Sequence, residues 1–172
     1  RMASLVGSTP RVAVDEKVAG LPSYTGMYIP ESSGNYDLVV RQLMHGGLRG
    51  EYFDNQWFLD QPVLERIDPL IDFDWGTGTL THYGRDYVSI RWSGKLVAPS
   101  TEEYTLHVLA DDGSRLFMDH KLLIDGWDYC CGELRAQVNL TAGTFHDLVL
   151  EYKDETGSAQ VVQWYVNDVP VM

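Results

Sequence analysis

Apolar and polar residues alternate along this chain in short runs, which are separated by polar or glycine-containing breaks. Alternation at every second position predicts a β-strand with one buried face. The clearest runs cover residues 48–53, 87–92, 101–109, 134–140, 145–152 and 161–166. We find no long stretch with a helical period. The pattern predicts an all-β protein, and many short strands joined by glycine-rich turns favour an antiparallel β-sandwich.

The segment 110–127, ADDGSRLFMDHKLLIDGW, is the part around which we expect the rest of the chain to be organised. Two apolar strands on either side of the polar break at 119–121 predict a β-hairpin. The loop before it carries adjacent carboxylates, Asp111 and Asp112, followed by Gly113. Such a loop can be solvated, can cap turns, or can hold a cation. Calcium would suit it because calcium prefers several hard oxygen ligands, although Asp and Gly are also ordinary turn formers.

For several segments outside this hairpin we expect structural roles only. Ile67 to Trp75 is expected to form one strand, with Asp68 and the two acids after it on the wet face. We expect Gly94 to separate two strands. Segment 54–60, with Trp57 and Phe58, is expected to be a loop or one helical turn. Aromatic residues on the alternating strands are expected in the core: Trp75, Trp92, Tyr104, Phe117, Phe145 and Trp164.

The pattern of alternating apolar and polar residues becomes stronger after Gly46-Gly47, where we place a domain boundary. Residues 1–20 are weakly patterned, Pro22, Gly26 and Pro30 interrupt the next stretch, and 36–43 alternates as a strand, whereas residues 46–170 hold the strong strand patterns. A length of 172 residues suits one domain plus an appendage. The chain opens at Arg1 without a signal peptide, so we expect an excerpt of a longer protein.

The overall charge limits the choice of partner. The formal net charge is −12, which argues against binding to nucleic acid or to anionic membrane surfaces. No apolar run is long enough to cross a bilayer, so direct membrane insertion is not expected. An acidic surface is compatible with cation binding.

The only cysteines, Cys130 and Cys131, are neighbours. Three states are open: free thiols, a vicinal disulfide with a strained ring, or a bridge to a cysteine elsewhere in a longer protein. The spacing does not match a zinc site, because there is no second cysteine pair and no suitable histidine spacing.

No catalytic arrangement can be argued from the sequence. The five histidines show no ligand spacing and no partnered nucleophile, and abundant acids alone do not make a catalytic pair. We therefore expect no enzyme activity. Asn139-Leu140-Thr141 is an N-glycosylation sequon, whose occupancy the sequence leaves open.

Four segments together resemble the PA14 domain: GLRGEYF at 47–53, VSIRWSG at 88–94, the hairpin segment at 104–127, and AGTFHDLVLEY at 142–152. The resemblance implies a β-sandwich module of the kind found in bacterial toxins, carbohydrate-active enzymes and adhesins. In sugar-binding members, the two adjacent acids are joined by a cis peptide and hold a calcium ion that coordinates sugar hydroxyls.

The resemblance implies roles for individual residues of the hairpin. Asp111 and Asp112 match the two calcium-binding acids, and Gly113 matches the glycine that follows. Trp127 matches the aromatic residue after the second strand, and with Asp125 it is a candidate ligand contact. For Trp127 we favour a core position over sugar stacking.

The remaining calcium ligands would come from a second loop near the C-terminal end. The candidates are Asp154, with Glu155 beside it, and the pair Asn167-Asp168.

The lead-in has a resemblance of its own. YIPESSGNYDLVV, at residues 28–40, resembles the end of a filamin-type immunoglobulin-like repeat. Residues 1–45 would then be the last part of such a repeat, or a linker.

Two functions follow from these expectations. The first is a calcium-dependent carbohydrate-binding or adhesion module, extracellular or on the cell surface, with a glycan or glycoprotein as partner. The alternative is a structural or protein–protein interaction module without a ligand site, in contact with neighbouring domains of a large assembly that is intracellular.

Overall fold

The structure is a computed structural model that describes strands 3–5, 15–19, 21–25 and 40–42 and residues 46–129 and 131–167, with side chains over 46–129 and 131–163. The chain divides into two units, Arg1–His45 and Gly46–Met172. Within the described ranges, no helix is long and apolar enough to span a membrane.

The first unit contains two short antiparallel pairs. β1 (Ala3–Leu5) pairs with β4 (Val40–Gln42), and β2 (Asp15–Ala19) pairs with β3 (Leu21–Thr25). The segment that resembles a filamin-type repeat lies almost wholly outside the described residues, so that resemblance stays a prediction.

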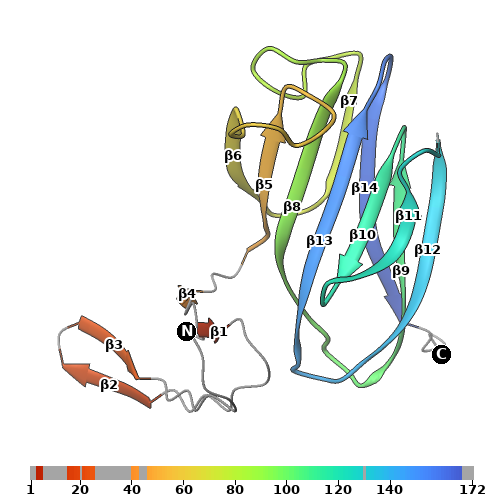
Figure 1. Ribbon diagram of the computed structural model, residues 1–172. Helices are drawn as coiled ribbons and strands as arrows, with labels where there is room; N and C mark the ends of the chain where they lie inside the picture. The colour runs from red at the N-terminus through yellow and green to blue at the C-terminus, as the bar shows by residue number, and fades with distance from the viewer. Residues whose placement is uncertain are drawn as a thin grey trace, which may run out of the picture. The chain divides into compact units, whose positions relative to one another are not determined.

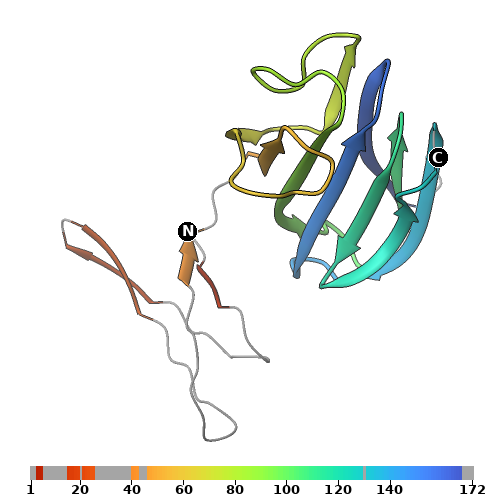
Figure 2. The same cartoon turned by 45° about the horizontal axis from the view of Figure 1, so that its top comes forward.

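The second unit is a sandwich of two antiparallel sheets, one lying behind the other in Figure 1, and Figure 2 shows them tilted forward. The six-stranded sheet has the order β11-β10-β13-β8-β5-β6, and the four-stranded sheet has the order β12-β9-β14-β7. This confirms the predicted antiparallel β-sandwich. The strands are β5 (Leu48–Phe53), β6 (Leu64–Asp68), β7 (Asp72–Gly76), β8 (Val88–Val97), β9 (Glu102–Ala110), β10 (Ser114–Met118), β11 (Lys121–Gly126), β12 (Gly132–Leu140), β13 (Phe145–Asp154) and β14 (Ala159–Asn167).

The core lies between the two sheets and comes from the inward-facing side chains of both. Its largest fully buried members are Trp92, Tyr52, Tyr104, Tyr152, Ile90, Leu106, Leu116, Leu150, Val88, Val108 and Val161. Two of the aromatic residues expected in the core, Trp92 and Tyr104, are therefore buried. Trp75 packs against the core from a half-buried position, and Phe117 is also half-buried.

Phe145 does not belong to the core, because its side chain is 39% exposed. It is the first residue of β13 and pairs with Val97, the last residue of β8, which is also exposed. Both residues lie on the outer face of the six-stranded sheet, because strand alternation turns Leu148 of β13 and Trp92 of β8 toward the core instead. The side chain of Trp164 lies outside the described residues.

Gly94 does not end a strand as predicted, because β8 runs unbroken through it. A Cβ atom at this position would lie 2.6 Å from Cδ2 of Leu48 on the neighbouring β5. Glycine is therefore present here because the strand packs closely against Leu48.

The predicted single strand from Ile67 to Trp75 is two strands, β6 and β7, which belong to different sheets. The chain changes sheet at Pro69 and Leu70, between them. Asp72 is exposed as expected, but Asp68 is buried. The prediction of a wet face was wrong for Asp68 because the chain turns into the other sheet just after it.

Asp68 accepts three hydrogen bonds inside the sandwich. The donors are the Tyr52 hydroxyl (2.7 Å), Nε1 of Trp92 (2.7 Å) and Nε of Arg66 (2.6 Å). A Cβ atom on Gly50 would lie 2.5 Å from Oδ2 of Asp68, so glycine leaves room for the network. A buried carboxylate with a cation and two neutral donors is fully satisfied.

Candidate functional site

Three loops that are distant in sequence meet at the end of the sandwich that lies uppermost in Figure 1. The backbone N–H of Glu155, after β13, donates to Oδ2 of Asp112, after β9 (2.6 Å). The N–H of Tyr87, before β8, donates to the Glu155 carbonyl (3.0 Å), and the N–H of Gly157 donates to Oδ1 of Asp86 (3.2 Å). These bonds bring together Asp86, Asp111, Asp112 and Asp154, which we call the acidic cluster.

Asp112 has an unusual backbone conformation. Its φ is 91°, in the region that favours glycine. None of the described peptide bonds is cis, so Asp111 and Asp112 are joined by a trans bond and the cis bond implied by the family resemblance is not found. The chain reverses here through the φ of Asp112. Burial raises the pKa of the Asp112 carboxyl, and the charges of Asp111 and Glu155 act in the same direction, against the hydrogen bond from the Glu155 N–H.

Asp154 is the last residue of β13 and is completely buried. Its Oδ1 lies 3.5 Å from the Tyr152 hydroxyl, and its Oδ2 has no hydrogen-bond partner among the described atoms. Burial raises its pKa to about 7, and the charges of Asp112 and Asp86 contribute. A buried carboxylate oxygen without a donor is costly, unless a cation or a proton takes that position.

The acidic cluster offers the donor chemistry that calcium prefers, namely carboxylate oxygens with backbone carbonyls beside them. However, among the described residues no three His, Cys, Asp or Glu side chains converge closely enough to hold a metal ion. A calcium ion here would therefore need backbone carbonyls, water or ligand hydroxyls to complete its shell. The unpartnered Oδ2 of Asp154 is the atom that best fits such an ion.

The structure brings together some of the predicted metal ligands and separates others. Asp111, Asp112 and Asp154 are neighbours, and Asp86 joins them although no pattern in the sequence indicates it. Asn167 pairs with Tyr104 at the start of β9, whereas Asp111 follows the end of that strand, so the two lie at opposite ends of the sheet. Asp168 lies outside the described residues.

Gly113 is required by close packing. A Cβ atom there would lie 2.3 Å from the carbonyl oxygen of Trp127 and 2.5 Å from Cε of Lys153. The Gly113 carbonyl also accepts the Lys153 N–H (2.8 Å). The third residue of the Asp-Asp-Gly motif thus fastens the loop to β13 and to the chain after β11.

Trp127 is half-buried and is not a member of the buried core cluster. Two cations lie over its ring, the Arg115 guanidinium at 4.1 Å from the ring centroid and Nζ of Lys153 at 5.3 Å. The ring of Phe58 lies beside it, with the centroids 5.7 Å apart. Asp125 is exposed, and its Oδ1 accepts the Trp127 N–H (3.4 Å). The favoured core interpretation of Trp127 is therefore replaced by a place among cations on the outer surface.

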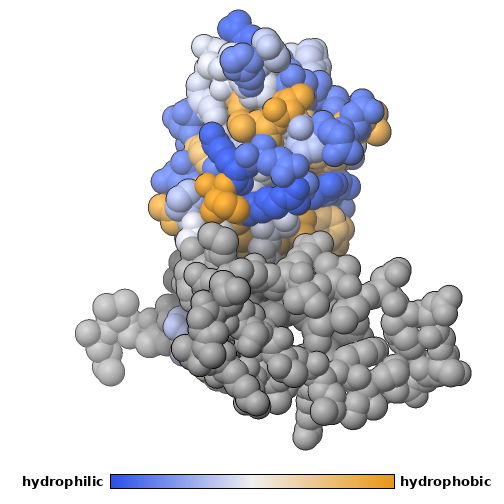
Figure 3. Space-filling model, turned by 90° about the vertical axis from the view of Figure 1, so that its left-hand side faces the viewer, coloured by the Kyte–Doolittle hydropathy of each residue, from blue (hydrophilic) through white to orange (hydrophobic). Residues whose placement is uncertain are grey.

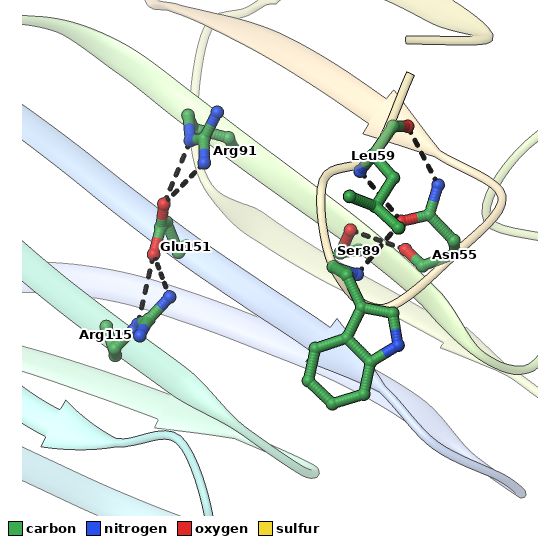
Figure 4. Close-up of polar contacts among 7 residues, drawn as sticks. Asn55, Leu59, Ser89, Arg91, Arg115 and Glu151 are labelled. Atoms are coloured by element: carbon green, nitrogen blue, oxygen red, sulfur yellow. Dashed lines mark hydrogen bonds and ion pairs between the residues drawn. The ribbon is translucent and has the colours of Figure 1, made fainter. Parts of the chain in front are cut away.

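The same surface carries a paired network that the sequence analysis missed. Glu151 of β13 lies between Arg91 of β8 and Arg115 of β10, as Figure 4 shows. Oε1 accepts from Nε and Nη2 of Arg91 (3.0 and 2.8 Å), and Oε2 accepts from Nε and Nη2 of Arg115 (3.1 and 2.6 Å). Phe58 covers Arg91, with 4.3 Å from the guanidinium to the ring centroid. Strand alternation places these residues on one outer face but does not predict their pairing.

Cys131 lies beside the acidic cluster. Its Sγ is 3.0 Å from Oδ1 of Asp111, and the residue is disulfide-bonded. The free-thiol alternative therefore does not hold for Cys131. Cys130 lies outside the described residues.

Comparison with known proteins identifies a family whose model this chain matches and individual proteins that it resembles. Residues 44–170 match the model of the PA14 domain. The anti-sigma-I factor RsgI3 of Acetivibrio thermocellus is 43% identical over 123 residues, which are 70% of this chain and 19% of that protein. A solved anti-sigma factor domain-containing protein from Clostridium clariflavum is 40% identical with a TM-score of 0.68, covering 74% of this chain and 44% of the other.

A more distant structure is similar in fold. The PA14 sugar-binding domain from an RTX adhesin is 19% identical with a TM-score of 0.56, and the match covers 72% of this chain and 91% of that one. The chain spans about a fifth of the length of the curated anti-sigma factor and less than half of the solved one.

Proposed function

Because this chain belongs to the PA14 domain family, we propose that its second unit is a non-catalytic module of a larger protein that binds carbohydrate with the help of calcium. The observation that carries the proposal is the buried Asp154 carboxylate. Its Oδ2 has no hydrogen-bond partner, and the next residue, Glu155, donates its N–H to Asp112. The sugar-binding domain of the RTX adhesin shares the fold and supports the same function here.

In this proposal three residues of the acidic cluster bind the calcium ion directly. Asp111, Asp112 and Asp154 supply carboxylate oxygens, and a bound calcium ion would offset their mutual repulsion and present open positions to sugar hydroxyls. The Glu155 N–H orients the Asp112 carboxylate before any ion arrives. Gly113 and Lys153 hold the loop against β13. A surface module of this kind acts outside the cell or on its surface.

The second candidate is a structural or interaction module within a large multidomain protein, either outside the cell or in an intracellular assembly. It is favoured by one observation, that no three potential metal-ligating side chains converge within the described part of the chain. In that case the acids only stabilise the loops through hydrogen bonds such as those of Asp112 and Asp86, and the partners of the module are neighbouring domains.

Calorimetric titration of calcium chloride into the chain distinguishes the two candidates. We expect binding with a dissociation constant in the range of about 10⁻⁶ to 10⁻³ M, as for other sites of this ligand type. Asp112→Ala is expected to abolish the heat. Glu103→Gln, which removes one exposed carboxylate at the other end of β9, is the matched control and is expected to leave it unchanged. No heat from the parent chain at millimolar calcium would favour the structural module.

A further inference from the structure

Trp57 is an exposed tryptophan on the loop between β5 and β6. Its side chain is 62% exposed, although an indole is one of the largest apolar groups that folding can bury. Among the described residues, no aromatic ring and no cation stacks on the Trp57 indole. The indole face is therefore open to a ligand.

The loop that carries Trp57 is held rigid by one side chain. Oδ1 of Asn55 accepts the N–H groups of Trp57 and Leu59, both at 3.0 Å, and Nδ2 of Asn55 donates to the Leu59 carbonyl at 3.0 Å. The hydroxyl of Ser89 on β8 donates to the Asn55 carbonyl (2.6 Å), so the loop is also fixed to the sheet (Figure 4). The backbone under Trp57 is thus fixed before any ligand binds.

The next residue orients Trp57 outward. Phe58 has a φ of 55°, an uncommon value for a bulky residue, and its ring turns toward Phe53, with the centroids 5.6 Å apart. Phe58 also covers Arg91 and approaches Trp127. With Phe58 packed onto the sheet, its neighbour Trp57 extends into solvent.

The same loop is tied to the acidic cluster. Nε2 of Gln56 donates to the backbone carbonyl of Asp154 (3.0 Å). Trp57 follows Gln56 directly, so it lies at the same end of the sandwich as the acidic cluster. A ligand chain that begins at the acidic cluster has the indole as a neighbouring flat surface.

We propose that Trp57 is a stacking platform for a further pyranose ring of an oligosaccharide whose first sugar lies at the acidic cluster. The inference rests on the proposed function and names the ligand class as an oligosaccharide. The apolar C–H face of a pyranose matches the flat apolar face of an indole. A fixed loop also lowers the ordering cost of binding.

The surroundings of the platform favour a sugar over a protein partner. Leu59, Val63, Ile67 and Leu70 are also exposed on or near β6. Figure 3, which views this side, shows separate hydrophobic areas divided by hydrophilic residues and no single continuous patch. The fully buried centre of a protein–protein interface is more apolar than the rest of the surface, and large continuous apolar patches mark such interfaces.

The test compares full-chain variants on an array of immobilised monosaccharides and oligosaccharides in the presence of calcium. Trp57→Ala is expected to lose about tenfold or more in affinity for the oligosaccharides that the parent binds, a loss of about 1.4 kcal/mol, and to keep the parent's monosaccharide and calcium binding. Trp57→Phe is expected to regain most of the affinity. Leu59→Ala, which removes an equally exposed apolar side chain (58%) from the same loop, is the matched control and is expected to bind like the parent.

Each other outcome overturns the inference in a different way. If Trp57→Ala binds oligosaccharides as well as the parent does, Trp57 is not a stacking platform. The proposed function still holds in that case, provided that Asp112→Ala abolishes calcium and sugar binding. If the parent chain binds no glycan, both the stacking platform and the proposed function are wrong. If sedimentation shows that Trp57→Ala abolishes self-association and glycan binding is unchanged, the indole is a contact between copies of this chain.

Discussion

Nε1 of Trp92 donates a hydrogen bond to Oδ2 of Asp68 at 2.7 Å, so the largest buried side chain of the sandwich is anchored to a buried carboxylate. The same oxygen accepts the Tyr52 hydroxyl. Burial raises the pKa of Tyr52, and the hydrogen bond to Asp68 raises it further, so Tyr52 remains a neutral donor. Trp92, Tyr52 and Asp68 link three neighbouring strands, β8, β5 and β6.

Replacing Asp68 is expected to destabilise the sandwich strongly. Asp68→Ala leaves the hydroxyl of Tyr52 and Nε1 of Trp92 without their acceptor in the core, so we expect a loss of about 3–5 kcal/mol in the free energy of unfolding. Urea denaturation followed by tryptophan fluorescence measures it. Asp72→Ala, an exposed acid on β7, is the control and is expected to change stability by less than about 0.5 kcal/mol. Similar losses in the two variants would contradict this account.

Removing the charge of Glu151 is expected to weaken the outer face. In Glu151→Gln one amide replaces a carboxylate that pairs with both Arg91 and Arg115, and these arginine side chains remain about one-third exposed. We expect a loss of about 2 kcal/mol, since solvent screening reduces the cost of the two unpaired cations. Urea denaturation at low and high salt measures the loss and its screening.

Glu65→Gln provides the comparison for Glu151. Glu65 pairs with Arg49 at 2.9 Å, but both side chains are about half exposed. We expect less than about 0.5 kcal/mol from this change. A loss as large as that of Glu151→Gln would show that exposure does not decide the strength of these pairs.

The stability of the calcium-free protein is expected to fall as the pH rises toward neutrality. The pKa of Asp154 is about 7 in the folded chain, whereas an unfolded Asp has a pKa of about 3.9. Between these values the folded state holds a proton that the unfolded state has released, so the free energy of unfolding decreases with pH. The full shift corresponds to about 4 kcal/mol as an upper limit. Asp154→Asn, measured by urea denaturation with a chelator present, is expected to lose this pH dependence.

Calcium is expected to reverse the order of stability between the parent and Asp154→Asn. Without calcium at pH above about 7 the variant is expected to be the more stable, because it has no buried charge. Calcium at about 100 times its dissociation constant is expected to stabilise the parent by about 2.7 kcal/mol and the variant by much less. Thermal melts with and without calcium test this. A variant that gains as much as the parent would show that Asp154 is not a ligand.

The strands were predictable because their alternation records which face is buried. The hairpin 114–124 and the strand 48–53 lie where the pattern places them. Gly94 and Asp68 were misjudged, since local propensity favours a break and a wet face, whereas contacts with Leu48 and Trp92 decide the outcome. Those contacts join residues distant in sequence, which a local pattern does not record.

The acidic cluster was predictable only in part, for the same reason. Adjacent acids in a loop made Asp111 and Asp112 candidate ligands, and the family resemblance added Asp154 to them. Asp86 is joined to this end of β13 by bonds that Gly157 and its neighbour Tyr87 make, and the loop of Trp57 is joined to it by Gln56. Nothing in the composition of those loops indicates that they meet β13.

Gly113 has a consequence for how related sequences are interpreted. The glycine is demanded by the Trp127 carbonyl and the Lys153 side chain, whether or not an ion is bound. A descendant that gave up its ligand would still be under selection to keep this glycine, since any larger residue would push the hairpin away from β13. The glycine of the Asp-Asp-Gly motif therefore reports how the hairpin packs on β13, and its presence alone does not indicate an ion site.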